Sequence, residues 1–140
     1  MRQPTLLDTG PLVAYLSWRD PYHEWAIEEF AATSAPFLTC EAVVVEASFL
    51  LGKFPDGIDR LFEAFALHGL RIAFRLDAEL DPVASLMNRY RNVPMSLADA
   101  CLVRMAETNP GSVLLTLDRD FRIYRMSRRK VIPLRMPSAK

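Results

Sequence analysis

Short apolar runs alternate with helix-like segments along the whole chain, and this alternation constrains the fold more than any other feature. The strand-like runs are residues 4–7, 36–39, 70–74, 113–117 and a shorter one at 131–133. The segments with helical spacing are residues 11–16, 23–32, 41–53, 58–67, 77–91 and 97–108, with a helical turn at 119–125. Such alternation is typical of a parallel sheet with helices on both faces. It predicts a three-layer α/β/α fold with a central, mostly parallel sheet of four to five strands.

Length and composition predict one folded domain. The chain has 140 residues, of which 51% are hydrophobic and 24% charged, which is typical of a globular protein. We expect the domain to span residues 1–135 and the last residues, 136–140, to form a flexible tail. No apolar run is long enough to cross a bilayer, and the opening MRQPTLLDTG lacks the apolar core of a signal peptide. We therefore expect a cytoplasmic protein without membrane contact.

The cysteines offer no sign of a zinc site. Cys40 and Cys101 each stand in apolar surroundings and are predicted to be buried free thiols. The sequence has neither a CxxC nor an HExxH pattern, which argues against zinc.

Positive charge is concentrated near the end of the chain, although the net charge is zero. Eight of the 17 Lys and Arg residues lie within residues 119–140, where Asp120 is the one acid. This end is therefore either a solvated surface or a face for a polyanion. Arg119 follows Asp118 directly, Arg122 and Arg125 lie close behind, and all three are candidates for holding phosphate groups.

Four acids stand next to or inside apolar segments. Asp8 follows the first strand, Asp118 follows a late strand, and Glu46 and Asp99 lie within apolar helical runs. Ligands of parallel sheets bind at the carboxyl ends of the strands, so Asp8 and Asp118 meet there if their strands are neighbours.

Each acid also has a purely structural explanation. Asp8 can cap the next helix, and Asp99 can form a capping box with Ser96. Asp118 and Asp120 can be turn residues. An acid in apolar surroundings is nevertheless costly unless it is paired or bound to a cation, and no basic partner is near in sequence. Carboxylates without histidine suit Mg²⁺ or Mn²⁺, which favours a metal site.

Four motifs together resemble a known family. These are LLDTGPLVAYL, VVVEASFLL, MSLADACLVRMAE and VLLTLDRDF, in this order along the chain. The set is similar to the PIN domain, and more closely to the VapC toxins of bacterial and archaeal VapBC toxin–antitoxin pairs. The resemblance extends from about residue 5 to about residue 133, and SLADA and TLDRDF are its most specific parts.

The resemblance implies a PIN-like fold and an endoribonuclease that depends on Mg²⁺ or Mn²⁺. By match to the family motifs, the metal-binding and catalytic acids are Asp8, Glu46, Asp99 and Asp118, assisted by Asp120. Thr116, and more weakly Thr9, match residues that line such sites. Glu41 competes with Glu46 for the role of the helix acid, but Glu46 fits better because apolar residues follow it directly.

The implied partners are an RNA substrate, a second copy of the chain in a homodimer, and a VapB-like antitoxin. The resemblance places an apolar antitoxin segment on the helices at 22–32 and 41–51.

Three alternatives stay open. The first is a PIN nuclease that works in RNA processing without an antitoxin, and the second is a catalytically silent PIN-like module that binds RNA with its basic end. The third is a receiver-like acid pocket. It ranks last because it would need a lysine after a late strand, and neither Lys53 nor Lys130 fits that position.

Overall fold

A five-stranded parallel sheet forms the centre of the computed structural model, which describes residues 3–34 and 36–138. The strand order is β3-β2-β1-β4-β7, and every neighbouring pair is parallel. The strand bounds are β1 Thr5–Leu7, β2 Phe37–Thr39, β3 Leu70–Ile72, β4 Val113–Leu115 and β7 Leu134–Arg135. The carboxyl ends of all five strands therefore lie at one edge of the sheet.

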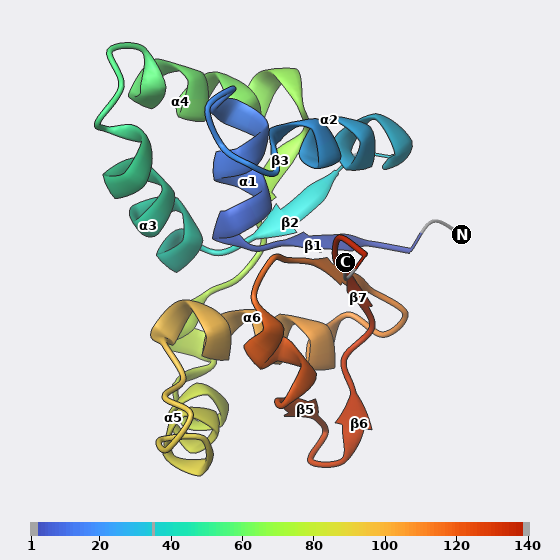
Figure 1. The fold of residues 1–140 in the computed structure, drawn as a ribbon. Helices are drawn as coiled ribbons and strands as arrows, with labels where there is room; N and C mark the ends of the chain where they lie inside the picture. The colour runs from blue at the N-terminus through green and yellow to red at the C-terminus, as the bar shows by residue number, and fades with distance from the viewer. Residues whose placement is uncertain (1–2, 35, 139–140) are drawn as a thin grey trace.

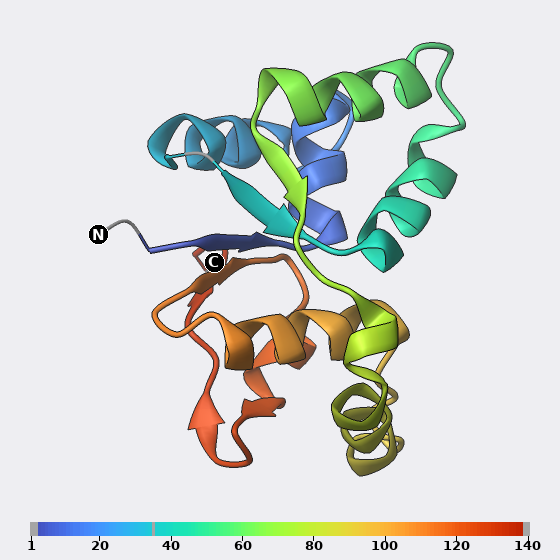
Figure 2. The same cartoon turned by 180° about the vertical axis from the view of Figure 1, so that it is seen from behind.

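Helices cover both faces of this sheet (Figures 1 and 2). One layer holds α1 (Thr9–Leu16), α2 (His23–Ala32), α3 (Glu41–Leu51) and α4 (Gly57–Leu67). The other layer holds α5 (Leu80–Arg89), preceded by the 3₁₀ turn η1 (Leu76–Ala78), and α6 (Leu97–Thr108). The predicted three-layer α/β/α architecture is confirmed.

The core is deepest around β1, β4 and α6. Leu6, Leu7, Leu114 and Leu115 are fully buried because helices cover both sides of their strands. α6 is buried along eight of its twelve residues, and one of these is the acid Asp99. α6 thus carries the carboxyl group of Asp99 into the interior of the protein.

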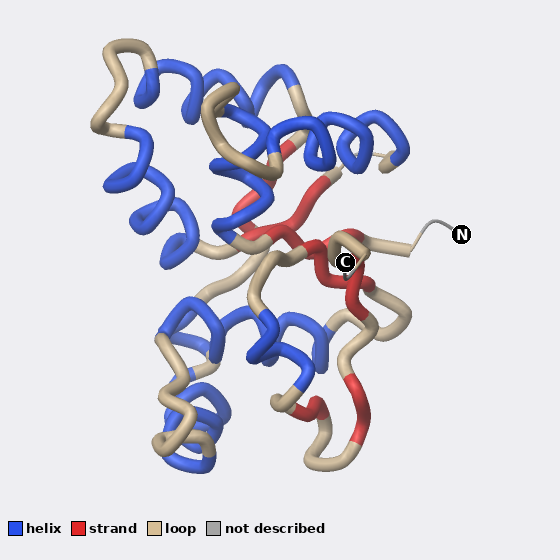
Figure 3. Tube along the Cα trace, in the orientation of Figure 1, coloured by secondary structure: helices blue, strands red, loops and turns tan. Residues whose placement is uncertain are grey.

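The chain after β4 differs most from the sequence prediction (Figure 3). The strand expected at 113–117 ends at Leu115, and the 3₁₀ turn η2 (Arg119–Arg122) follows. The single strand expected at 131–133 is replaced by two short strands on either side of Ile132 and Pro133. Residues Lys130–Val131 (β6) pair antiparallel with Arg125–Met126 (β5), while β7 begins after Pro133 and joins the main sheet. A proline has no backbone N–H to donate, so it suits the gap between the two strands.

Two other expectations concern the membrane and the end of the chain. In the described part of the chain, no helix is both long and apolar enough to cross a bilayer. The predicted tail at 136–140 falls partly outside the described residues, which end at 138.

Candidate metal centre

The pairing of β1 with β4 brings distant acids to one edge of the sheet. Leu7 lies opposite Leu115, and the backbone N–H of Asp8 donates to the Leu115 carbonyl at 3.1 Å. Asp8 therefore lies beside the start of the loop that carries Thr116 and Asp118. The two strands are neighbours, as the interpretation of these acids required.

Asp8 is held by two donors. The Thr116 hydroxyl donates to Asp8 Oδ2 at 2.6 Å, and the Thr9 backbone N–H donates to Oδ1 at 2.8 Å. Asp8 is only 6% exposed, and it occupies the N-cap of α1. The carboxylate is thus fixed in orientation and almost removed from water.

Thr116 connects Asp8 to the loop after β4. Its oxygen accepts the backbone N–H of Asp118 at 3.0 Å, and Asp118 Oδ1 accepts the backbone N–H of Asp120 at 2.9 Å. Asp118 and Asp120 are both partly buried. One hydroxyl therefore orients the Asp8 carboxylate and fixes the turn that presents Asp118.

Asp99 approaches from the opposite layer. It is the third residue of α6, whose N-cap Ser96 accepts the Asp99 backbone N–H at 3.0 Å. The Tyr124 hydroxyl donates to Asp99 Oδ2 at 2.8 Å. Tyr124 is itself fully buried, with its ring edge-on to Phe121 and Tyr90. The side chain of Asp99 is therefore held on a rigid aromatic support.

Burial and mutual repulsion destabilise the charged form of these acids. Desolvation raises the pKa of Asp8 to about 7, against the lowering effect of its hydrogen bonds. The negative charges of Asp99 and Asp118 contribute to this rise in the Asp8 pKa. The pKa of Asp99 is also raised, first by burial and then by Asp118 and Asp120, while the Tyr124 hydroxyl opposes the shift. Four carboxylates thus share one electrostatic environment.

No cation in the described part of the chain neutralises this group. The ion pairs among residues 3–34 and 36–138 are Arg75–Asp77, Arg104–Glu79, Arg104–Glu107 and Arg135–Glu29. The buried Thr9 hydroxyl, next to Asp8, has no hydrogen-bond partner within those residues. A group of partly or fully buried carboxylates without a counter-charge is what a bound cation with its water shell would neutralise.

The donor chemistry fits Mg²⁺ or Mn²⁺. The side chains are carboxylates and hydroxyls, which are hard oxygen ligands. Within the described residues, no three His, Cys, Asp or Glu side chains already lie close enough to ligate a single ion. Mg²⁺ is usually bound through one or two carboxylates and retains several waters, so a looser set of acids also suits it.

The remaining residues that the sequence predicted for the site are more accessible to solvent. Glu46 and Glu41 are both exposed on α3, and neither side chain makes a hydrogen bond or an ion pair among the described residues. Arg119 and Arg122 are exposed on η2. Arg125 is turned back on its own chain, since its Nη1 donates to three carbonyls between residues 122 and 124 at 2.7–3.1 Å.

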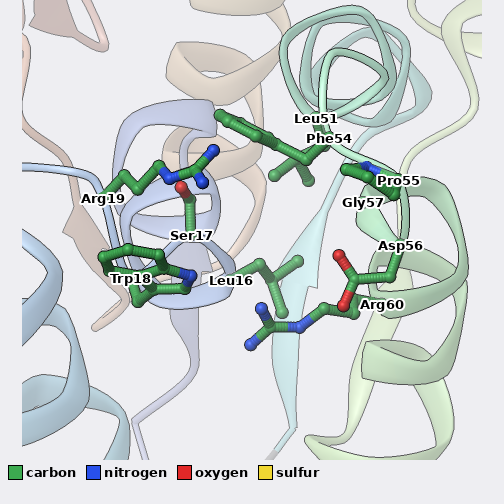
Figure 4. Close-up of a pocket in the computed structure, with 10 residues that line it drawn as sticks. All are labelled: Leu16, Ser17, Trp18, Arg19, Leu51, Phe54, Pro55, Asp56, Gly57 and Arg60. Atoms are coloured by element: carbon green, nitrogen blue, oxygen red, sulfur yellow. The ribbon is translucent and has the colours of Figure 1, made fainter.

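A separate pocket of about 150 Å³ lies at the C-terminal ends of α1 and α3 (Figure 4). The Arg19 guanidinium lies 4.9 Å from the ring centre of Trp18 and 5.5 Å from that of Phe54. None of the candidate acids lines this pocket.

The comparison with protein families decides what kind of domain this is. The model of the PIN domain matches residues 5–126, which is most of the chain and contains all the acids described above. The chain belongs to the PIN domain family. The resemblance seen in the sequence motifs is thereby confirmed.

Within the PIN family, the likeness is to VapC proteins. The protein "Ribonuclease VapC26" of Mycobacterium tuberculosis (strain ATCC 25618 / H37Rv) is 28% identical over 117 residues, covering 81% of this chain and 86% of that protein. Among solved structures, the crystal structure of VapBC2 from Rickettsia felis bound to a DNA fragment from their promoter matches with a TM-score of 0.65. That match is 12% identical and covers 97% of this chain and all of the other chain, so it supports the shared fold.

Tyr124 is the participant that the sequence motifs did not reveal. Its position three residues after Phe121 places both rings on one side of a helical turn, which is a signal for burial. The sequence contains no signal that the Tyr124 hydroxyl would reach Asp99, 25 residues away.

The raised pKa of Asp8 predicts how stability depends on pH in metal-free protein. A carboxyl with a pKa near 4 unfolded and about 7 folded stabilises the protein fully below pH 4, and this stabilisation is lost as the pH rises to 7. A shift of about 3 units corresponds to about 4 kcal/mol. In EDTA, the free energy of unfolding measured with urea should therefore fall between pH 5 and 8.

The matched variants are Asp8→Asn, which should flatten this profile, and Asp59→Asn, an exposed acid on α4, which should follow the wild type. If the free energy of unfolding of the wild type does not change from pH 5 to 8, the pKa of Asp8 is not raised in the folded protein.

Proposed function

We propose that this PIN domain is a Mg²⁺- or Mn²⁺-dependent endoribonuclease and the toxin of a VapBC-type pair. The observation that carries the proposal is the convergence of buried, unneutralised carboxylates at the shared carboxyl end of β1 and β4. The folded protein gains no stability from such a group of acids, since burial and neighbouring negative charges raise the pKa of Asp8 and Asp99. The arrangement is typical of a functional site.

The substrate explains why acids and a cation belong together. An RNA phosphodiester is an anion, and the carboxylates alone would repel it. A divalent cation held there would offset that repulsion, lower the pKa of the attacking water and stabilise charge on the phosphoryl oxygens. We assign Asp8, Asp99 and Asp118 to holding it, with Glu46 and Asp120 completing the set.

The residues around these acids set their geometry. Thr116 fixes Asp8 and the Asp118 turn, and Tyr124 fixes Asp99. Fixed ligands need no reorganisation when the phosphodiester binds, which favours catalysis. Arg119 and Arg122 are exposed on the turn that begins directly after Asp118, where their guanidinium groups are available to RNA phosphates.

The toxin assignment is supported by the likeness to VapC proteins, one of which is named a ribonuclease and one of which was crystallised with VapB. We propose a VapB-like antitoxin whose apolar segment covers α2 and α3, where Ile27, Val45 and Phe49 are 42%, 69% and 76% exposed. A homodimer is part of the proposal, with the exposed Phe62 and Leu67 of α4 as candidate contacts.

Loss of a single acid should abolish RNA cleavage. Purified protein is incubated with total RNA in Mn²⁺, in Mg²⁺ or in EDTA, and the fragments are separated on a gel. Discrete fragments are expected with either cation and none with EDTA. Asp8→Asn and Asp99→Asn should reduce the cleavage rate by at least about 100-fold, because the cation loses a ligand. The exposed-acid control Asp59→Asn should cleave like the wild type. Cleavage that survives EDTA or both substitutions would overturn the proposal.

We expect the Thr116 hydroxyl to contribute both to metal affinity and to the rate of RNA cleavage. Thr116→Val removes both hydrogen bonds at nearly constant volume, and we expect a loss of about 10–100-fold in cleavage rate and in apparent Mn²⁺ affinity. Thr116→Ser retains the hydroxyl and should restore both quantities to within a few-fold. Equal losses in Val and Ser variants would indicate a packing role only.

A further inference from the structure

We propose that the β5–β6 hairpin is an RNA-binding arm that contacts phosphates outside the catalytic centre through Arg128, Arg129 and Lys130. The inference rests on the proposed function and names a second contact surface for the same substrate. It goes beyond the arginines of η2, because the hairpin is a separate two-stranded element on the α5–α6 side of the main sheet (Figure 1).

The tip of the hairpin carries exposed, unneutralised positive charge. Arg128, Arg129 and Lys130 are consecutive and exposed, and none of them forms an ion pair within residues 3–34 and 36–138. The nearby acid Glu107 is occupied by Arg104 at 3.2 Å. Charge of one sign at this density attracts a polyanion.

The arm is held in place at its first residue, Arg125, and at its turn, Ser127. The Ser127 backbone N–H donates to Glu107 Oε2 at 2.6 Å, and the Arg125 backbone N–H donates to the Tyr90 hydroxyl at 3.0 Å. Met126 pairs with Lys130 across the hairpin. A basic segment whose only role was to keep the protein soluble would not require these two hydrogen bonds or the strand pairing.

The turn of the hairpin is conformationally costly for the residues it contains. Ser127 has φ 49° and Arg128 has φ 73°, in the left-handed region where glycine is favoured. Hairpin turns with positive φ usually contain Gly, Asn or Asp. An arginine at such a position is unfavourable for stability, and strain of this kind is most common at functional sites.

The arm is directly connected to the candidate metal centre. The chain runs from Asp118 through η2 to Tyr124, whose hydroxyl contacts Asp99, and the hairpin starts at the next residue. At about 3.3 Å per residue, Arg128 lies within about 13 Å of Tyr124 along the chain, a span of a few nucleotides. An RNA strand cut at the acids can therefore reach the arm.

The test is RNA binding in EDTA, where the RNA stays intact. The probe is a fluorescein-labelled single-stranded RNA of about 20 nucleotides, with DNA of the same sequence in parallel, and Kd is measured by anisotropy over a range of NaCl. Arg128→Ala/Arg129→Ala should raise Kd about tenfold and reduce the slope of log Kd against log salt by about 1.4, the value for two phosphate contacts. The matched control Lys53→Ala/Arg71→Ala removes two exposed cations elsewhere and should bind like the wild type.

A single substitution separates binding from folding. Arg128→Gly removes one charge and the backbone strain together, so its Tm should equal or exceed that of the wild type while its RNA affinity falls about threefold. A loss of affinity in a protein that is at least as stable cannot be a folding defect.

The outcomes distinguish this inference from the proposed function. If the wild type cleaves total RNA in Mn²⁺ and the arm variants bind RNA with unchanged Kd and salt dependence, the proposal that the arm binds RNA is wrong and the nuclease proposal is supported. If the arm variants lose RNA and DNA binding but the wild type cleaves nothing, the arm stands as a phosphate-binding element and the nuclease fails. Loss of binding to a partner protein alone, with RNA affinity unchanged, also overturns the RNA assignment.

Discussion

The hydrogen bond from the Thr116 hydroxyl to the Asp8 carboxylate joins residues 108 positions apart, and the rest of the site depends on it. It is made possible by the register of β1 against β4, which places the ends of both strands at the same edge. The same hydroxyl accepts from Asp118 and so sets the following turn. The sheet topology is therefore also the mechanism that assembles the acids.

The structural and functional explanations of the acids turn out to be compatible. Asp8 caps α1, Asp118 caps η2, and Ser96 caps the helix that carries Asp99. Helices that follow parallel strands begin at the carboxyl edge, so their caps lie where ligands bind. This is why Asp8, Asp99 and Asp118 could be located at strand ends and helix starts from local sequence, whereas Thr116 was expected only from the resemblance to the family.

Features that depend on tertiary contacts could not be inferred in this way. The Tyr124 contact with Asp99 depends on how η2 packs on α6, and no local pattern encodes that distance. The replacement of the strand expected at 131–133 by β6 and β7 depends on the pairing of β6 with β5 and of β7 with β4. The folding back of Arg125 likewise depends on the shape of the turn after η2. The α/β layering was predictable because the apolar periodicity that defines a helix or strand is visible within a few consecutive residues. The contacts of Tyr124, β6 and β7 instead join residues that are far apart in sequence or depend on how whole elements pack.

The central claim is that the acids at the ends of β1, β4 and α6 form one cation site. The most direct test is a crystal of the protein grown with Mn²⁺ and measured at a wavelength where manganese scatters anomalously. The account predicts an anomalous peak bordered by the carboxylates of Asp8, Asp99 and Asp118, which disappears in Asp8→Asn crystals. A well-ordered wild-type crystal with no peak there, or with a peak only at other acids, would contradict it.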